Sequence, residues 1–253
     1  MKKSIKTTDE LIDKDNYRNI FKTIIGFNEK GKIDVNYIQN ILKLNIDEYC
    51  IEKTNDGHRK YYEAIHKKIK NIKINYKKTD LKKQIEKKLN EIYDFTKIDE
   101  SGGISKHYKF CHIWGYSRNP WLNCAYWNTW FVPYIYAELT EENKCGKVGE
   151  KLRKELKKEI LNNKTIRKYI EDYNNTIYSK LYNDDIKDIL NKKYTYKDKN
   201  GVHNVKIKNI IRQFILINME NGSEQCLFEV KDNFVELSEN IDKRLYGIEE
   251  KKN

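Results

Sequence analysis

The sequence has few of the features that cross-link a chain or carry it across a membrane. Its five cysteines are Cys50, Cys111, Cys124, Cys145 and Cys226. They are scattered, odd in number and without a Cys-x-x-Cys pair, which argues against a disulfide scaffold and a cysteine-rich zinc site. No run approaches the ~18–20 consecutive apolar residues of a membrane span. No apolar segment follows the charged residues 1–6, so we expect no signal peptide. A reducing cytoplasm fits this pattern best.

Proline is scarce as well, with two residues in 253. No Pro/Gly-rich linker and no internal repeat divides the chain, so we expect one continuous domain. Within it, residues 1–100 are expected to be helical and Lys-rich, residues 101–146 form a region of distinct composition, and residues 147–253 add helices and a β-hairpin to the same core. Apolar residues recur at helical spacing over much of the chain, for example at Leu81, Ile85, Leu89 and Ile92. The fold class predicted is α+β, mostly helical.

The hairpin is expected near the C-terminus, where the apolar period changes. Residues 211–219 and 224–230 are rich in Ile, Leu, Phe and Val. Asn221-Gly222 lies between these two runs, which predicts a β-hairpin with a type I′ turn.

The charge of +12 is concentrated in one part of the chain. Residues 59–88 contain twelve Lys or Arg and three acidic residues, a net charge of +9, whereas residues 220–253 have a net charge of −4. Such a block favours contact with a polyanion, although a solvated helix surface explains it equally well. The candidate contacts in this block are Lys67, Lys68, Lys70, Lys73, Lys77 and Lys78.

Residues 102–143 differ sharply from the rest of the chain. All four tryptophans and both prolines lie between residues 114 and 133. The pattern predicts a short strand over residues 108–113 that contains His112, then a loop over 115–127 that is broken by Asn119-Pro120. A second strand follows over 129–132, and a helix begins at Tyr134.

This order of elements resembles the HNH, or ββα-metal, nuclease motif, and most of all the type II restriction endonucleases of that family. His112 matches the histidine that ends the first strand, and Asn128 follows sixteen residues later at the start of the second. Residues 130–133 match the apolar strand that comes next. The phrases His-Ile-Trp, Asn-Pro, Trp-Asn and Leu-Thr-Glu-Glu add to the likeness.

The resemblance implies a role for each of these residues. His112 would activate water, Asn128 would hold the loop, and Glu138 or Asn143 on the following helix would bind a divalent metal ion. Cys111 occupies the position where the family often has an acidic residue or histidine, so a second ligand could instead be Glu141 or Glu142.

An imidazole that is largely neutral at neutral pH suits a general base. Carboxylate and amide oxygens suit Mg²⁺ or Mn²⁺. The resemblance also implies double-stranded DNA as substrate and a homodimer on a palindromic target. Arg118, in the loop after His112, is a further candidate DNA contact.

Other interpretations remain open at this stage. A PD-(D/E)XK nuclease could use Glu220, Glu229 and Lys231, and a non-catalytic protein could bind nucleic acid through its Lys block alone. His112 could be a packed histidine, and Asn128 could cap a turn. The tryptophans could form core or stack on bases. His107 could contact phosphate, whereas surface positions are expected for His58, His66 and His203.

Overall fold

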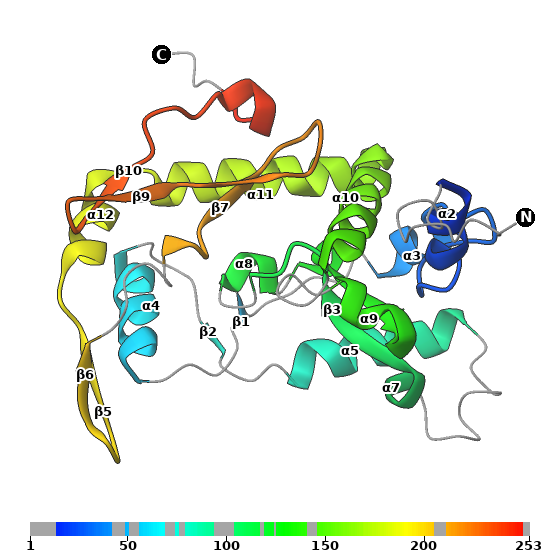
Figure 1. Ribbon diagram of the computed structural model, residues 1–253, viewed down its shortest axis with the longest axis horizontal. Helices are drawn as coiled ribbons and strands as arrows, with labels where there is room; N and C mark the ends of the chain where they lie inside the picture. Colours follow the sequence, from blue (N-terminus) through cyan, green and yellow to red (C-terminus); the bar gives the residue numbers. More distant parts are fainter. Residues whose placement is uncertain are drawn as a thin grey trace, which may run out of the picture. The chain divides into compact units, whose positions relative to one another are not determined.

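The computed structural model describes residues 14–41, 49–50, 56–68, 74–75, 79–93, 104–116, 119–123, 125–140, 146–204 and 211–249. It combines helices with short strands, which confirms the α+β class (Figure 1). The chain forms two compact units, each assembled from separate stretches. Unit 1 comprises Met1–Asn45, Thr79–Gly115 and Ala125–Ile166, and unit 2 comprises Ile46–Lys78, Tyr116–Cys124 and Arg167–Asn253.

Over its described residues, unit 1 consists of helices and the antiparallel strand pair β3–β4. Its helices are α2 (Lys14–Phe21), α3 (Val35–Asn40), α5 (Thr79–Ile92), α7 (Ile104–His107), α9 (Tyr134–Thr140), α10 (Gly146–Asn162) and the 3-10 helix η1 (Tyr126–Asn128). The strands β3 (Tyr108–His112) and β4 (Thr129–Pro133) pair from Tyr108 with Pro133 to His112 with Thr129. Helix α9 directly follows β4 and packs against α10.

Unit 2 contains the remaining strands, all in two-stranded sheets. Its helices are α4 (Asp56–Lys68), α8 (Pro120–Asn123), most of α11 (Lys164–Leu181), α12 (Asp184–Asn191) and the 3-10 helix η2 (Lys243–Tyr246). Its strands are β1 (Tyr49–Cys50), β2 (Ile74–Asn75), β5 (Thr195–Asp198), β6 (Gly201–Asn204), β7 (Ile215–Ile217), β8 (Glu224–Cys226), β9 (Phe228–Lys231) and β10 (Phe234–Leu237). The pair β1–β2 is parallel, and the pairs β5–β6, β7–β8 and β9–β10 are antiparallel.

A buried asparagine joins helix α11 to the C-terminal part of unit 2. The Asn174 amide nitrogen donates to the carbonyl oxygens of Ile217 (2.7 Å) and Tyr246 (2.9 Å), and its Oδ1 accepts from the Ile217 amide (2.9 Å). One side chain therefore satisfies backbone groups of strand β7 and of η2, which would otherwise be buried without partners.

The predicted C-terminal hairpin is present, but its predicted turn type is wrong. Strands β7 and β8 are antiparallel partners, yet Asn221 does not have the positive φ that a type I′ turn requires, whereas Gly222 does (φ 72°). The loop is longer because Asn218 Oδ1 accepts hydrogen bonds from the amides of Glu220 (2.8 Å) and Asn221 (3.3 Å). Positive φ at two successive residues occurs instead at Asp232 and Asn233, between β9 and β10.

The core of unit 1 is centred on Trp130. Its ring stacks on Tyr37, with ring centroids 4.7 Å apart, and lies 5.2 Å from the ring of Phe27. Gly26 passes beside this pair with φ +101°, and a Cβ there would lie 2.7 Å from Tyr37 Cδ2 and 2.8 Å from Trp130 Cζ3. Glycine is therefore required both by the backbone conformation and by the space available.

Replacing Gly26 by alanine is expected to lower the free energy of unfolding by about 2–4 kcal/mol, since backbone strain and overpacking add. Gly201→Ala is the matched control, because Gly201 has φ +123° with no atom within 4 Å of an added Cβ. Urea unfolding of both variants separates the two contributions. Equal losses of unfolding free energy in Gly26→Ala and Gly201→Ala would show that overpacking against Tyr37 and Trp130 does not destabilise Gly26→Ala.

No helix in the part of the chain that the structure describes is long and apolar enough to cross a membrane.

Candidate functional site

His112 lies at the end of the β3–β4 pair, and its side chain is partly exposed to solvent. His112 is the last residue of β3 and pairs with Thr129, the first residue of β4. The edge of its ring meets the ring of Phe110, with centroids 5.8 Å apart and planes at 73°. Successive side chains of a strand alternate between faces, so Cys111, which is buried, lies on the opposite face from His112. Cys111 is therefore not placed to share a ligand with His112.

Asn128 holds the three residues that follow His112. Its Oδ1 accepts from the Trp114 amide at 2.8 Å, and its amide nitrogen donates to the Gly115 carbonyl at 3.4 Å. The Asn128 backbone carbonyl accepts from the Ile113 amide at 2.9 Å. Because the Asn128 side chain is fully buried, these bonds are shielded from water and fix the course of the loop.

The neighbouring residue Thr129 is also anchored from two sides. Its hydroxyl lies 3.3 Å from the carbonyl oxygens of Ala125 and Tyr126, and its own carbonyl accepts from the Tyr37 hydroxyl at 3.3 Å. Burial, with smaller contributions from Tyr93 and Tyr126, raises the pKa of Tyr37 well above its ordinary value, so its hydroxyl remains a donor. The strand opposite His112 is thus fixed in position.

The tryptophans of this segment form core. Trp114 and Trp127 meet edge to face with centroids 5.6 Å apart, and Trp130 Nε1 donates to the Trp127 carbonyl at 3.0 Å. These three and Trp121, which belongs to unit 2, are all buried. Stacking of bases on their rings is therefore not supported.

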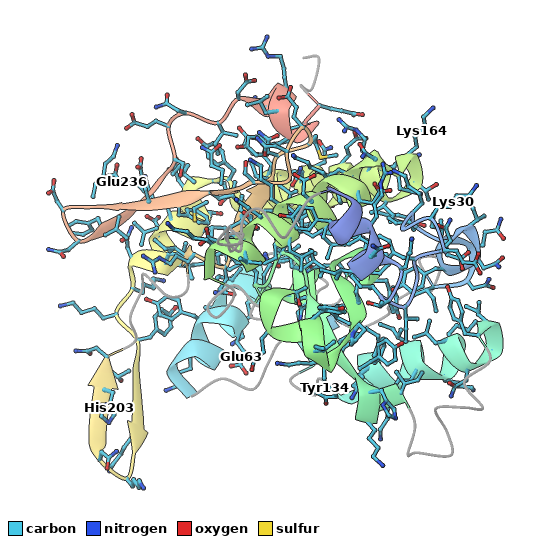
Figure 2. The ribbon with its side chains drawn as sticks, turned by 45° about the vertical axis from the view of Figure 1, so that its right-hand side comes forward. Lys30, Glu63, Tyr134, Lys164, His203 and Glu236 are labelled. Atoms are coloured by element: carbon cyan, nitrogen blue, oxygen red, sulfur yellow. The ribbon has the colours of Figure 1, made fainter. Side chains whose placement is uncertain are left out.

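Helix α9 carries one of the two expected metal ligands. Glu138 is exposed on α9, which begins at the exposed Tyr134 (Figure 2). Asn143, Glu141 and Glu142 lie outside the described residues. Among the described residues, no three His, Cys, Asp or Glu side chains are grouped so that they could hold a metal ion. The described side chains therefore do not by themselves provide a complete set of ligands for a divalent cation.

Two cations on α10 reach the same loop, and neither was predicted as a site residue from the sequence. The Arg153 guanidinium donates through Nη2 to the Ile113 carbonyl at 3.4 Å, and Lys157 Nζ lies 5.7 Å from the centre of the Trp114 ring. Both side chains are buried, with exposed fractions of 8% and 7%. The signal for them was present, because both lie at helical spacing on the face that buries Leu152, Leu156 and Ile160.

The Lys-rich block is divided between the two units. Lys67 and Lys68 are exposed on α4 in unit 2, where Lys68 Nζ lies 3.8 Å from Asp185 Oδ2. Lys83 and Lys87 are exposed on α5 in unit 1. The other candidate contacts, Lys70, Lys73, Lys77, Lys78 and Arg118, lie outside the described residues.

The residues of the PD-(D/E)XK interpretation lie in unit 2. Glu229 and Lys231 are on β9, and Lys231 Nζ pairs with Glu239 Oε1 (2.7 Å) and with Glu229 Oε1 (3.3 Å). The hydrogen bonds from Lys231 to Glu239 and then to Glu229 raise the pKa of Lys231. Glu220 lies in the loop between β7 and β8, a different hairpin from that of Glu229.

The remaining histidines are distributed over several elements. His107 is exposed at the end of α7, and His203 is half-buried on β6 (Figure 2). The side chains of His58 and His66 lie outside the described part of the chain. His203 belongs to unit 2, whereas His112 belongs to unit 1.

Comparison with known proteins places the chain in a family. A family model described as "Uncharacterised protein PM1201" matches residues 12–221, which include both strands of the β3–β4 pair, α9 and α10. The chain belongs to the PM1201 family. Over 68 residues the chain is 32% identical to the uncharacterized protein PM1201 of Pasteurella multocida (strain Pm70). The aligned residues make up 25% of this chain and 31% of that relative. No solved structure matches the chain.

Proposed function

We propose that this PM1201-family chain is a metal-dependent endonuclease of the HNH type that hydrolyses phosphodiester bonds in double-stranded DNA. The observation that carries the proposal is the buried Asn128, whose side chain binds the backbone of Trp114 and Gly115 directly after a partly exposed histidine. A catalytic imidazole has to be held in one position while it remains accessible to water and substrate. Asn128 fixes the backbone that follows His112, and the His112 side chain is partly exposed, which supports this role.

The proposal assigns each residue the role that the resemblance to HNH nucleases implies. His112 takes a proton from the attacking water, and Asn128 keeps the loop after His112 in place. A bound Mg²⁺ or Mn²⁺ would offset charge on the scissile phosphate. Glu138 is the described side chain that could contribute to such an ion, with Asn143 as the second expected ligand.

The wider function proposed is that of a type II restriction enzyme acting in the cytoplasm. The exposed Lys67 and Lys68, with the other lysines of residues 59–88 and Arg118, would contact the DNA backbone without reading its sequence. Two copies related by two-fold symmetry would match a palindromic site. Discrete fragments from a DNA of known sequence would support this wider function, and a smear would contradict it.

Incubation of supercoiled plasmid with the full-length protein is the direct test. We expect nicked and linear DNA with Mg²⁺ or Mn²⁺ and none with excess EDTA, and we expect activity to return when the cation is restored. The variant Glu229→Ala should cleave as the wild type does. Cleavage that is lost in Glu229→Ala but kept in His112→Ala would favour the PD-(D/E)XK site. Binding without cleavage under every condition would favour a non-catalytic protein.

A further inference from the structure

Arg153 is a buried cation whose charge is not balanced by any described acidic side chain. Its side chain is more than nine-tenths buried, and its one hydrogen bond is the 3.4 Å contact from Nη2 to the Ile113 carbonyl. Nε is buried without a hydrogen-bond partner. A guanidinium has five N–H donors, so most of its capacity to bind an acceptor is unused in the described structure.

Burial of such a group is unfavourable unless an anion accompanies it. Removing a charge from water is costly, and buried arginines are therefore usually paired with carboxylate or phosphate groups. Among the residues that the structure describes, no carboxylate forms an ion pair with Arg153. A neutral donor would bind the Ile113 carbonyl without this cost, so the hydrogen bond to Ile113 does not explain why the residue is arginine.

Lys157 places a second cation on the same buried face of α10. It lies four residues after Arg153 on α10, on the same buried face, and its Nζ approaches the Trp114 ring. Like charges at this spacing on a helix repel each other. The two cations contact successive residues of the loop that begins after His112, at Ile113 and Trp114. An anion bound at this place would complete the hydrogen bonds of the Arg153 guanidinium.

We infer that Arg153 binds a non-bridging oxygen of a DNA phosphate beside the loop that follows His112, with Lys157 supplying a second positive charge. This inference rests on the proposed function for its choice of ligand. A planar guanidinium can engage two phosphate oxygens at once, which positions the group as well as attracting it. Arg153 would thereby hold the DNA backbone next to His112.

The test measures binding of a short DNA duplex to the full-length protein in EDTA, so that cleavage plays no part. Fluorescence anisotropy over a range of NaCl concentrations gives the affinity and its dependence on salt. We expect Arg153→Met to weaken binding by about 10–100-fold and to reduce the slope of log K against log salt by about one. Its melting temperature should equal or exceed that of the wild type, because an unbalanced buried charge has been removed.

Two further variants keep the test decisive. Lys154→Met removes a neighbouring cation from the exposed side of α10, and its slope should stay at the wild-type value. Arg153→Lys keeps the charge but not the planar fork, so it should restore the slope while the affinity remains below that of the wild type. If Arg153→Met does not fold, Arg153→Gln removes the charge while keeping a donor for the Ile113 carbonyl, and its slope should likewise fall by about one.

Several outcomes would overturn the inference. One is a lower melting temperature in Arg153→Met with an unchanged salt slope, which would make Arg153 a structural residue. Another is a loss of DNA affinity and of salt slope in Lys154→Met as large as that in Arg153→Met. That result would show only a general attraction between surface cations and DNA. A third is a melting temperature raised as much by inorganic phosphate as by the duplex, which would identify free phosphate as the ligand.

The inference and the proposed function can fail separately. A wild-type protein that binds DNA with an Arg153-dependent slope but never cleaves it would contradict the nuclease and leave the phosphate site standing. A protein that cleaves DNA while Arg153→Met shows the wild-type slope would contradict the phosphate site alone.

Discussion

Replacing His112 by alanine is expected to reduce the rate of plasmid cleavage by about 10²–10⁴-fold, which is the usual contribution of a general base. The fold should tolerate the change, because His112 is partly exposed at the end of a strand and its hydrogen-bonded pairing with Thr129 is made by the backbone. Loss of the ring contact with Phe110 should lower the free energy of unfolding by about 1 kcal/mol, the centre of the range for point mutants. Cleavage rates and melting temperatures measured on the same preparations would therefore separate chemistry from folding.

The matched control is His203→Ala, which removes the same group from β6 in unit 2. It should cleave DNA at the wild-type rate. DNA affinity in EDTA should be equal for wild type and His112→Ala, because a general base acts on water rather than holding the backbone. Wild-type cleavage by His112→Ala would end the assignment of this residue. Loss of cleavage in both variants would point to contamination or to a general effect of removing histidine.

The elements around His112 show which parts of the structure can be predicted from the sequence. Local patterns predicted the strand that ends at His112, the second strand after Asn128 and the helix from Tyr134, and the structure has all three. These elements depend on alternation of apolar residues and on Pro133, which act over a few residues. Sequence reasoning works here because neighbours along the chain are also neighbours in space.

The arrangement of the two units could not be obtained in this way. Each unit gathers stretches that are far apart in sequence, and the loop between β3 and β4 contributes residues 116–124 to unit 2. Asn119 shows the consequence. It was expected to interrupt a loop with Pro120, but its side chain accepts from the amides of Trp121 and Leu122 and donates to the Gln213 carbonyl, 94 residues away. No local pattern specifies such a partner.

Arg153 and Lys157 were missed for a different physical reason. Lysine and arginine are usually placed at the surface because a charge is costly to bury. The helical spacing of α10 nevertheless puts both side chains on its buried face. A lysine or arginine inside an apolar stripe therefore marks a candidate functional residue. Its residue type predicts a place at the surface, whereas its helical spacing predicts a place on the buried face.

The second large effect is expected for Asn128→Ala. Removal of the side chain leaves the buried Trp114 amide without the acceptor at 2.8 Å and the Gly115 carbonyl without the donor at 3.4 Å. Unsatisfied buried groups of this kind should lower the free energy of unfolding by about 2–4 kcal/mol. Cleavage should fall nearly as far as in His112→Ala, even at temperatures where the variant is folded, because the loop after His112 is no longer held.

Asn218→Ala is the control that distinguishes loss of the loop from loss of stability. Asn218 is also a buried asparagine, and its Oδ1 also binds backbone amides, those of Glu220 and Asn221 in the β7–β8 loop of unit 2. We expect a comparable loss of stability with cleavage retained below the melting temperature. Urea unfolding and cleavage assays at one low temperature compare the two variants directly. If both retain activity, Asn128 stabilises the fold without organising the site, and the observation on which the nuclease proposal depends loses its meaning.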